Sequence, residues 1–398
     1  MSPAESSPIS RAAWIILAAG FLVLFVGGGS RFAIGLTLKP MVDEFGWPRS
    51  QIGLTVGVFQ IVSAVCMFIA GRMVDRMSHR LVLGWGLVAS GIGIGAMSLV
   101  SQPWHAMLLF GIVFAIGNGV ASTTTVGVMV TRAFPGRTGL ANGFVTSGTS
   151  MGQLVMIAIL AAVLVQIGWR SVFLSLGVLH VVLVPLLLFG IPGAREAQQR
   201  RAAAPLEGMS LREATKTRTF WLLLVVYGIC GFDDFFVATH VVAFAQDRGV
   251  NAFLAGNLFA AMGLTAWIGV VAAGAWSDRV GPVRGTAWSF AARIAVFGLI
   301  VVDQSVWSVA IFALVFGATF FVTAPLTVLF VRDSFGLKNL GALTGLITMV
   351  HHICGGLGAW LGGRIFDETG DYRIAFITAF VASIGALAAT LAMRRQPA

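Results

Sequence analysis

Twelve long apolar runs, separated by short polar segments, constrain this chain more than any other feature of its sequence. Each run approaches or exceeds the ~20 apolar residues that a helix needs to cross the hydrocarbon core of a bilayer. A segment in lipid must satisfy its own backbone hydrogen bonds, so each run is expected to be an α-helix. The expected spans are 13–37, 50–72, 81–101, 105–131, 139–166, 171–191, 219–245, 253–275, 285–302, 305–331, 341–363 and 373–393.

The composition agrees with a protein that faces lipid over most of its surface. Only 11% of the 398 residues are charged, whereas a soluble globular domain carries about 25%. The chain is therefore predicted to be an all-α, multi-pass membrane protein with the bilayer as its main partner. The three cysteines lie in apolar runs without the spacing of a metal site, so they predict neither a metal nor a disulfide framework.

The distribution of lysine and arginine predicts the orientation of the chain. With the N-terminus inside, 18 of the 26 basic residues fall in cytoplasmic segments and six in outer ones. The remaining two, Arg31 and Arg293, lie within apolar runs. This bias places both termini in the cytoplasm, with a bacterial inner membrane as the expected location. Positive charge gathered in short loops also argues against a nucleic-acid partner.

The two halves of the chain repeat one another. The segment "GRMVDRMSHR" at 71–80 recurs as "GAWSDRVGPVR" at 274–284, with an offset of 203 residues. A second set of matches, which includes Gly117 with Gly317 and Thr123 with Thr323, has an offset of 200. Parallel six-helix repeats are a transporter architecture with the binding site between the halves.

The longest polar stretch separates these repeats and suggests the domain boundaries. We expect an N-terminal bundle over 1–191, a cytoplasmic linker over 192–218 and a C-terminal bundle over 219–398.

The loop at 71–80 resembles the signature between the second and third helices of the major facilitator superfamily. Its repeat at 274–284 and the twelve expected spans extend the resemblance over nearly the whole chain. The resemblance implies two bundles that rock to give alternating access, with a cytoplasmic latch of charged residues between them. A plain positive-inside anchor is the alternative reading of these loops. The implied latch residues are Gly71, Asp75, Arg76, Arg80, Gly274, Asp278 and Arg279.

Three further segments resemble the branch that contains monocarboxylate porters and oxalate/formate antiporters. They are the first-helix pattern at 29–53, the Arg-Gly pattern "RTGLANGFVTSGTSMG" at 137–152, and the central-loop and seventh-helix pattern that begins at Leu211. The eighth span, 253–275, lacks the Asp and Arg of the eukaryotic monocarboxylate carriers. The fifth span lacks the Gly-Pro motif of drug/proton antiporters.

Arg31 is the first candidate for substrate binding. It lies deep in the first span, directly after "GGGS". A charge at membrane depth is expensive and usually functional, and a guanidinium can bind a carboxylate through two parallel hydrogen bonds. A structural ion pair is the alternative role. Asp233 and Asp234 of the seventh span are the expected counter-charges, because the offset of 203 places Asp234 at the depth of Arg31. A buried carboxylate there could couple transport to a proton, and Asp234 is the preferred one.

The histidines of the spans are further candidates. His351 and His352 lie near the middle of the eleventh span, where either could contact substrate or relay a proton. Neighbouring helical residues do not share a face, so this pair does not predict a metal site. His240 of the seventh span is a weaker candidate for gating.

Uncharged polar residues complete the predicted substrate site, with interhelical hydrogen bonding as the alternative role for each. They are Asn118, Thr123 and Gln153. Arg293 lies in the ninth span, which by resemblance is peripheral, and is interpreted as structural.

The sequence therefore predicts a secondary transporter, acting as a monomer without a cofactor, that moves a small organic anion such as a monocarboxylate. Proton coupling is expected as one option. Export, or carriage of a vitamin, a drug or another larger metabolite on the same fold, is the alternative, and a membrane receptor or scaffold is a third class. No Walker loop or hydrolytic motif supports an enzyme.

Overall fold

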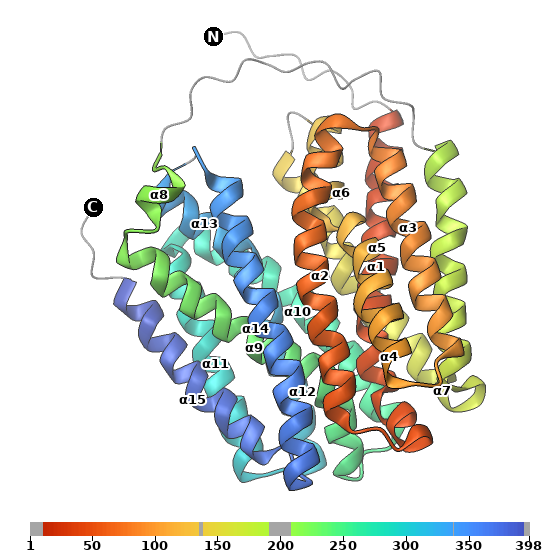
Figure 1. Cartoon of the computed structure of the whole chain (residues 1–398). Coiled ribbons are helices and arrows are strands. Elements are labelled where there is room, and N and C mark those ends of the chain that lie inside the picture. Colours follow the sequence, from red (N-terminus) through yellow and green to blue (C-terminus); the bar gives the residue numbers. More distant parts are fainter. Residues whose placement is uncertain (1–10, 135–137, 191–207, 337, 394–398) are drawn as a thin grey trace, which may run out of the picture.

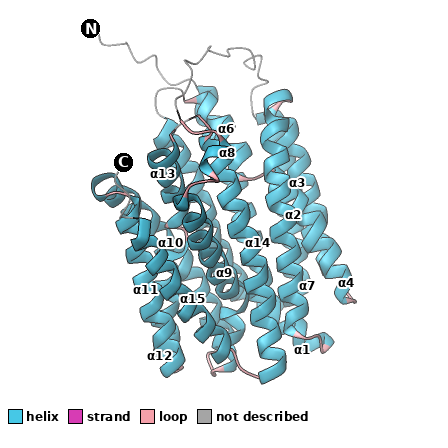
Figure 2. Cartoon of the chain, turned by 60° about the vertical axis from the view of Figure 1, so that its left-hand side comes forward, coloured by secondary structure: helices cyan, strands magenta, loops and turns pink. Residues whose placement is uncertain are grey.

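The computed structural model describes residues 11–134, 138–190, 208–336 and 338–393. Within these ranges the backbone is almost entirely helical, with short turns between the helices (Figure 2). The first bundle contains α1 (Arg11–Phe45), α2 (Arg49–Arg76), α3 (His79–Ala96), η1 (Met97–Leu99), α4 (Pro103–Ala106), η2 (Met107–Phe114), α5 (Ala115–Val120), α6 (Thr123–Ala133) and α7 (Thr138–Gly190). The short α8 (Leu211–Ala214) follows. The second bundle contains α9 (Arg218–Asp247), α10 (Ala252–Val280), α11 (Pro282–Val302), α12 (Val306–Phe320), α13 (Thr323–Phe335), α14 (Leu340–Thr369) and α15 (Arg373–Ala392).

The twelve expected spans are all accounted for by these helices. Ten helical segments of the described chain are long and apolar enough to cross a membrane. One of them lies within α7, which holds two spans because Gly168, at φ 73°, breaks the helix in its middle. Only glycine takes that backbone conformation readily. The remaining span consists of α12 and α13 together. The all-α fold with twelve spans is therefore confirmed.

The fourth and tenth spans break at equivalent places. The chain turns between α5 and α6 after Val120, and between α12 and α13 after Phe320. These breaks have the same spacing as the second set of sequence matches. The repeat seen in the sequence thus appears as a repeated interruption of the helix, a common feature of transporter halves near the binding site.

The two bundles lie side by side in Figure 1, with α6 and α8 at the upper end. We call this the linker end of the molecule and the other the far end. Most of the predicted linker lies outside the described residues. Its described part is held against the second bundle, because the Met209 amide donates to the Phe335 carbonyl. A capping box between Ser210 and Glu213 begins α8.

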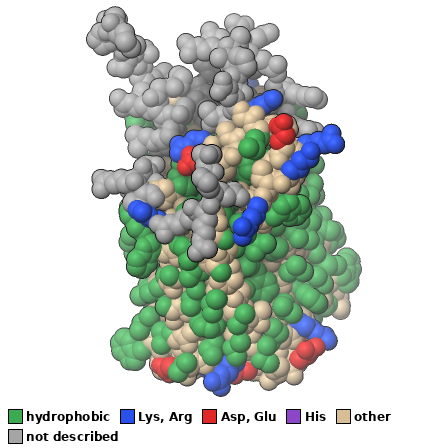
Figure 3. Space-filling view, turned by 90° about the vertical axis from the view of Figure 1, so that its left-hand side faces the viewer, with side chains coloured by type: hydrophobic (Ala, Val, Ile, Leu, Met, Phe, Trp, Pro, Cys, Tyr) green, Lys and Arg blue, Asp and Glu red, His purple; other side chains and the backbone are tan. Residues whose placement is uncertain are grey.

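The outer surface has the polarity that a bilayer requires. In Figure 3 a broad belt of hydrophobic side chains covers the middle of the molecule, and the coloured charged side chains lie above and below it. Exposed tryptophan, isoleucine, leucine and valine side chains are frequent on the spanning helices, as expected where the surface contacts lipid.

Close packing of glycines joins the two bundles toward the far end. Gly53 and Gly57 of α2 form a small-xxx-small pair, which lets helix backbones approach in lipid. A Cβ atom added to Gly57 would lie 3.1 Å from the carbonyl oxygen of Gly356 in α14. A Cβ atom on Gly53 would collide with the backbone of Ala359. The contact between α2 and α14 therefore depends on the absence of side chains there.

This packing predicts that Gly53→Leu destabilises the protein by about 1–3 kcal/mol, because the colliding atoms belong to backbone and cannot rotate away. Gly345→Leu on α14 is the matched control, since no atom lies within 4 Å of its Cβ position. Thermal unfolding in detergent should show a clear loss for the first variant and little change for the second. Equal melting temperatures would contradict the tight packing.

Candidate functional site

Arg31 lies beside a small pocket between the two bundles. The pocket is lined from the first bundle by α1, α2 and η2, and from the second by α9. Its volume is about 10 Å³, which is room for a single water molecule. The halves are therefore nearly closed around Arg31 in this conformation.

The guanidinium of Arg31 is held by aromatic rings instead of by an acid. Its Cζ atom lies 4.7 Å from the centre of the Phe235 ring and 5.5 Å from that of Phe32. Its Nε atom is buried without a hydrogen-bond partner. Among the described residues none forms an ion pair with it, and Asp234 acts on it only at longer range. Arg31 thus has unused capacity for an anion.

Asp233 and Asp234 are paired instead with Arg293 of α11, so the expected contact between Arg31 and Asp234 is not found. The Nη2 atom of Arg293 lies 2.7 Å from Oδ1 of Asp234, and its Nη1 atom lies 3.8 Å from Oδ2 of Asp233. Arg293 also donates two hydrogen bonds to Thr319. Its Nε atom donates to the Thr319 side-chain oxygen and its Nη2 atom to the Thr319 carbonyl oxygen, both at 3.1 Å. Arg293 is fully buried, which agrees with the structural role expected for it.

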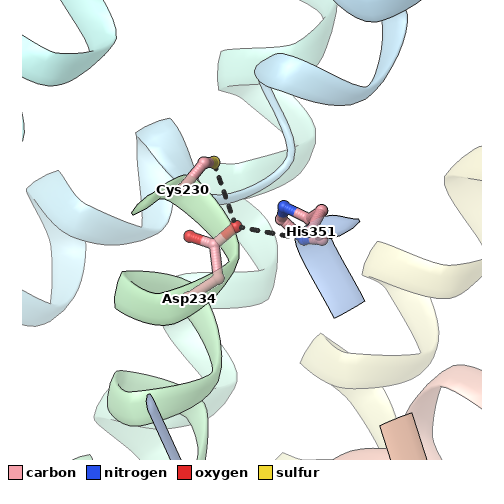
Figure 4. Close-up of side chains that lie close together, drawn as sticks. All are labelled: Cys230, Asp234 and His351. Carbon is pink, nitrogen blue, oxygen red and sulfur yellow. Dashed lines mark hydrogen bonds and ion pairs between the residues drawn. The ribbon is translucent and has the colours of Figure 1, made fainter. Parts of the chain in front are cut away.

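Cys230, Asp234 and His351 form a cluster next to this pair (Figure 4). The Sγ atom of Cys230 donates to Oδ2 of Asp234 at 3.5 Å, and Nε2 of His351 lies 3.8 Å from the same oxygen. These three side chains offer metal-ligand atoms within 4.8 Å of one another. The guanidinium of Arg293 already neutralises Asp234 and would repel a cation. The thiol is also within hydrogen-bond distance of Thr323. We therefore interpret the cluster as a hydrogen-bond network.

The two histidines of α14 differ in their surroundings. His351 faces Asp234 and places Nδ1 3.2 Å from the Tyr227 carbonyl. His352 is hydrogen-bonded within its own helix, with Nδ1 2.8 Å from the Thr348 carbonyl. The centres of both rings lie within 6 Å of the centre of the Phe235 ring. The arrangement connects His351 to the charged cluster and leaves His352 against α9.

Gln60 of α2 is a polar residue of the pocket that the sequence analysis did not select. Its side chain is 1% exposed, and neither amide atom has a hydrogen-bond partner among the described residues. It stands in the apolar run "VGVFQIVSAV", where a lone amide could have marked it. An unpaired buried amide costs about 1–3 kcal/mol, which makes Gln60 a candidate for contact with a ligand.

The other predicted polar residues are scattered around this centre. Gln153 of α7 donates to the Phe259 carbonyl across the two halves at 3.3 Å. Asn118 is half-buried, with its amide nitrogen against Gly27 of α1. Thr123 is exposed at the start of α6. None of the three lines the pocket of Arg31.

A charged network joins the bundles at the far end, and we call it the far-end closure. Asp247 at the end of α9 accepts from Arg49 of α2 at 2.6 and 3.0 Å, and from Lys39 of α1 at 3.3 Å. The carboxylate of Asp367 accepts the backbone N–H groups of Arg49 and Ser50 at 2.8 and 2.9 Å. An acid of one half therefore caps a helix of the other.

His240 belongs to this closure and not to the central cluster. Its Nε2 atom lies 2.7 Å from the Ala359 carbonyl and therefore carries the donated proton. Its Nδ1 atom accepts from the Tyr372 hydroxyl at 3.0 Å, and that hydroxyl accepts from Arg49 at 3.0 Å. The ring of Phe366 lies 3.7 Å from the Cζ atom of Arg49. The closure thus extends inward along a continuous chain of polar groups.

The hydrogen bonds and ion pairs described above between the two halves lie at the far end or near the middle. Most of the predicted latch at the linker end cannot be compared with this pattern. The side chains of Gly71, Asp75, Arg76, Gly274, Asp278 and Arg279 lie outside the described part of the structure. Arg80 is described, half-buried at the start of α3.

Comparisons with known proteins point to a family of transporters. The family model of the Major Facilitator Superfamily matches residues 20–238 and again 223–398. The MFS-type transporter YcxA of Bacillus subtilis is 27% identical over 92% of this chain and 91% of its own length. Human monocarboxylate transporter 11 is 24% identical, covering 95% and 82% of the two chains. The oxalate:formate antiporter of Oxalobacter formigenes is 24% identical, covering 93% and 89%.

A solved structure supports the fold. The bacterial homologue of the human lysosomal transporter Spinster, in an inward-facing and unoccupied conformation, superposes with a TM-score of 0.79. The two share 18% sequence identity, and the match covers 97% of this chain and 98% of the other.

The contrast between the two intramembrane arginines, Arg31 and Arg293, gives a stability prediction. Arg293→Met should destabilise the protein by about 3–5 kcal/mol, because it leaves Asp233 and Asp234 unpaired in the interior. Arg31→Met should cost less than about 1 kcal/mol, because it removes a cation that has no paired acid. Thermal unfolding of the two variants in detergent is the measurement. A larger loss for Arg31→Met would contradict the assignment of partners.

The far-end closure gives a conformational prediction. Asp247→Asn should weaken the contact of Arg49 and Lys39 with the second bundle and shift the far end toward open states. Spin labels at the exposed positions Asp43 and Glu368, near the ends of α1 and α14, should then report longer distances. Asp371→Asn is the control, because Asp371 pairs with Arg248 at 2.7 Å within one bundle. Identical distance distributions for both variants would count against the closure.

Proposed function

This chain belongs to the Major Facilitator Superfamily and is a multi-pass membrane transporter, and from that premise we propose that it carries a small organic anion, in particular a monocarboxylate. The observation that carries the proposal is the state of Arg31. It is an intramembrane cation that faces a pocket between the halves and has no paired acid among the described residues. Such a charge is maintained at a cost that function must offset.

The second intramembrane arginine sharpens this assignment. Arg293 forms hydrogen bonds or ion pairs with Asp233, Asp234, Cys230 and Thr319, so its guanidinium is fully committed. A carboxylate that entered the pocket would therefore meet Arg31, whose planar fork matches it in geometry and charge. The aromatic faces of Phe32 and Phe235 would hold the guanidinium in place meanwhile.

The relatives support the class of substrate. Two of them are named for the transport of monocarboxylates and of oxalate and formate, all of which are carboxylates. Their identity of 24% to this chain is compatible with a shared class and a different individual substrate. The absence of any charged residue from 253–275 means that coupling here would use other groups.

Charge balance supports proton coupling through the central cluster. Arg31 and Arg293 balance Asp233 and Asp234 when both acids are ionised. A bound substrate anion would leave one negative charge in excess, and protonation of an aspartate would remove it. Asp234 is the group we assign, with His351 3.8 Å away as the relay. The substrate and the proton would then cross together.

Alternating access follows from the position of the closure. By the distribution of basic residues, the linker end faces the cytoplasm and the far end faces outward. The far-end closure would then shut the outer side in this conformation. Release of Asp247 and Asp367 from the first bundle would expose Arg31 outward.

We expect Arg31→Met to reduce carboxylate uptake into proteoliposomes by at least about a hundredfold, since two charge-assisted hydrogen bonds are lost. Arg31→Lys should restore only part of this, because an ammonium lacks the planar fork. Arg170→Met is the control, since Arg170 is exposed and pairs with Glu44 within one bundle. Unchanged uptake by Arg31→Met would contradict the assignment of Arg31 as the carboxylate-binding residue. Specific binding without any movement of solute would instead favour a receptor.

A further inference from the structure

The pocket contains a second polar group that a plain carboxylate leaves unused. We propose that Gln60 is a specificity-determining residue that selects carboxylates bearing a hydroxyl group over their unsubstituted counterparts. The inference rests on the proposed function, because it requires Arg31 to hold the carboxylate. It adds a requirement on the rest of the substrate.

The state of Gln60 distinguishes it from the other buried amide at the interface. Gln153 uses its amide nitrogen to bond the Phe259 carbonyl. Gln60 has both Nε2 and Oε1 buried and unpaired among the described residues, although it lines the same pocket as Arg31. Thr239, the other uncharged polar residue of the pocket, satisfies itself by donating to the Phe235 carbonyl. Of these side chains, only Gln60 offers both a free donor and a free acceptor.

The chemistry of an amide defines what would satisfy it. One side presents two N–H donors and the other presents a carbonyl acceptor. A hydroxyl group answers both, because its oxygen accepts from Nε2 while its hydrogen donates to Oε1. A methylene group at the same place would leave the two amide atoms unpaired. The difference of about 1–3 kcal/mol is available for selection.

The remaining walls limit the substrate to one or two polar contacts. They are apolar or aromatic and include Phe32, Phe59, Phe110, Phe235, Ile34 and Val56. Phe110 lies in η2, a π-helical segment, a type of helix that occurs often at functional sites. A substrate with many hydroxyls would bury polar groups against these rings without partners. The pocket has room for about one water molecule in this conformation, so a substrate would need the halves to part. Once they part, this lining favours a compact acid with one hydroxyl close to its carboxylate.

The test compares matched pairs of acids in proteoliposome uptake. The pairs are glycolate with acetate, lactate with propionate, and mandelate with phenylacetate. The wild-type protein should prefer the hydroxy acid of at least one pair by roughly tenfold or more. In Gln60→Met, which keeps the length of the side chain and removes the amide, this preference should fall to about one. Uptake of the unsubstituted acid should be kept or raised.

Two controls separate selection from a structural effect. Gln153→Met removes the other buried amide and should reduce both acids of a pair alike. Gln60→Met should melt at the same temperature as the wild type or higher, because an unpaired buried amide is replaced by an apolar group.

The outcomes are distinguishable from failure of the proposed function. If the wild type moves both acids of every pair equally, or if Gln60→Met keeps the preference, the role of Gln60 is overturned while the anion carrier stands. If the wild type moves none of the acids, both proposals fall.

Discussion

The cost of holding charge inside a bilayer organises this structure from its middle outward. Arg31, Asp233, Asp234 and Arg293 lie within spanning helices, where each ion must find a partner or an aqueous cavity. Arg293 forms ion pairs with both aspartates inside the second bundle. Arg31 stands apart in the first bundle, with its charge against aromatic rings. The cation without a paired acid therefore lies where the two halves meet, and the small pocket is located there.

Much of the fold could be predicted because lipid imposes simple rules. Apolar length gave the spans. The breaks after Val120 and Phe320 share the 200-residue offset of the second set of matches, but the sequence analysis did not predict them. Other features follow from local geometry that hydropathy does not register. One of them is the π-helical segment η2. Which end is closed could not be predicted either. It depends on the balance between contacts at the far end and contacts at the linker end, and the sequence contains charged residues for both.

The sequence indicated which ionisable residues belong to the candidate site, but it did not indicate which of them pair with one another. Arg31, the two aspartates and His351 were selected because ionisable residues are rare in spans. The repeat placed Arg31 and Asp234 at one depth, but depth does not fix the direction in which a side chain points around its helix. Arg293 reaches the aspartates from a neighbouring helix of the same bundle, so comparison between the bundles could not reveal it. Gln60 carries no charge, and its significance appears only when its missing partners are seen.

The cap that Asp367 places on α2 links a helix end to the conformation of the whole molecule. The first N–H groups of a helix have no partners within the helix, and here two of them are satisfied by an acid from the opposite bundle. When the bundles separate at this end, the first turn of α2 loses about 0.5–2 kcal/mol of capping energy. Opening thus frays a helix as well as breaking ion pairs. The far end of the transporter should therefore be more rigid when it is closed than when it is open.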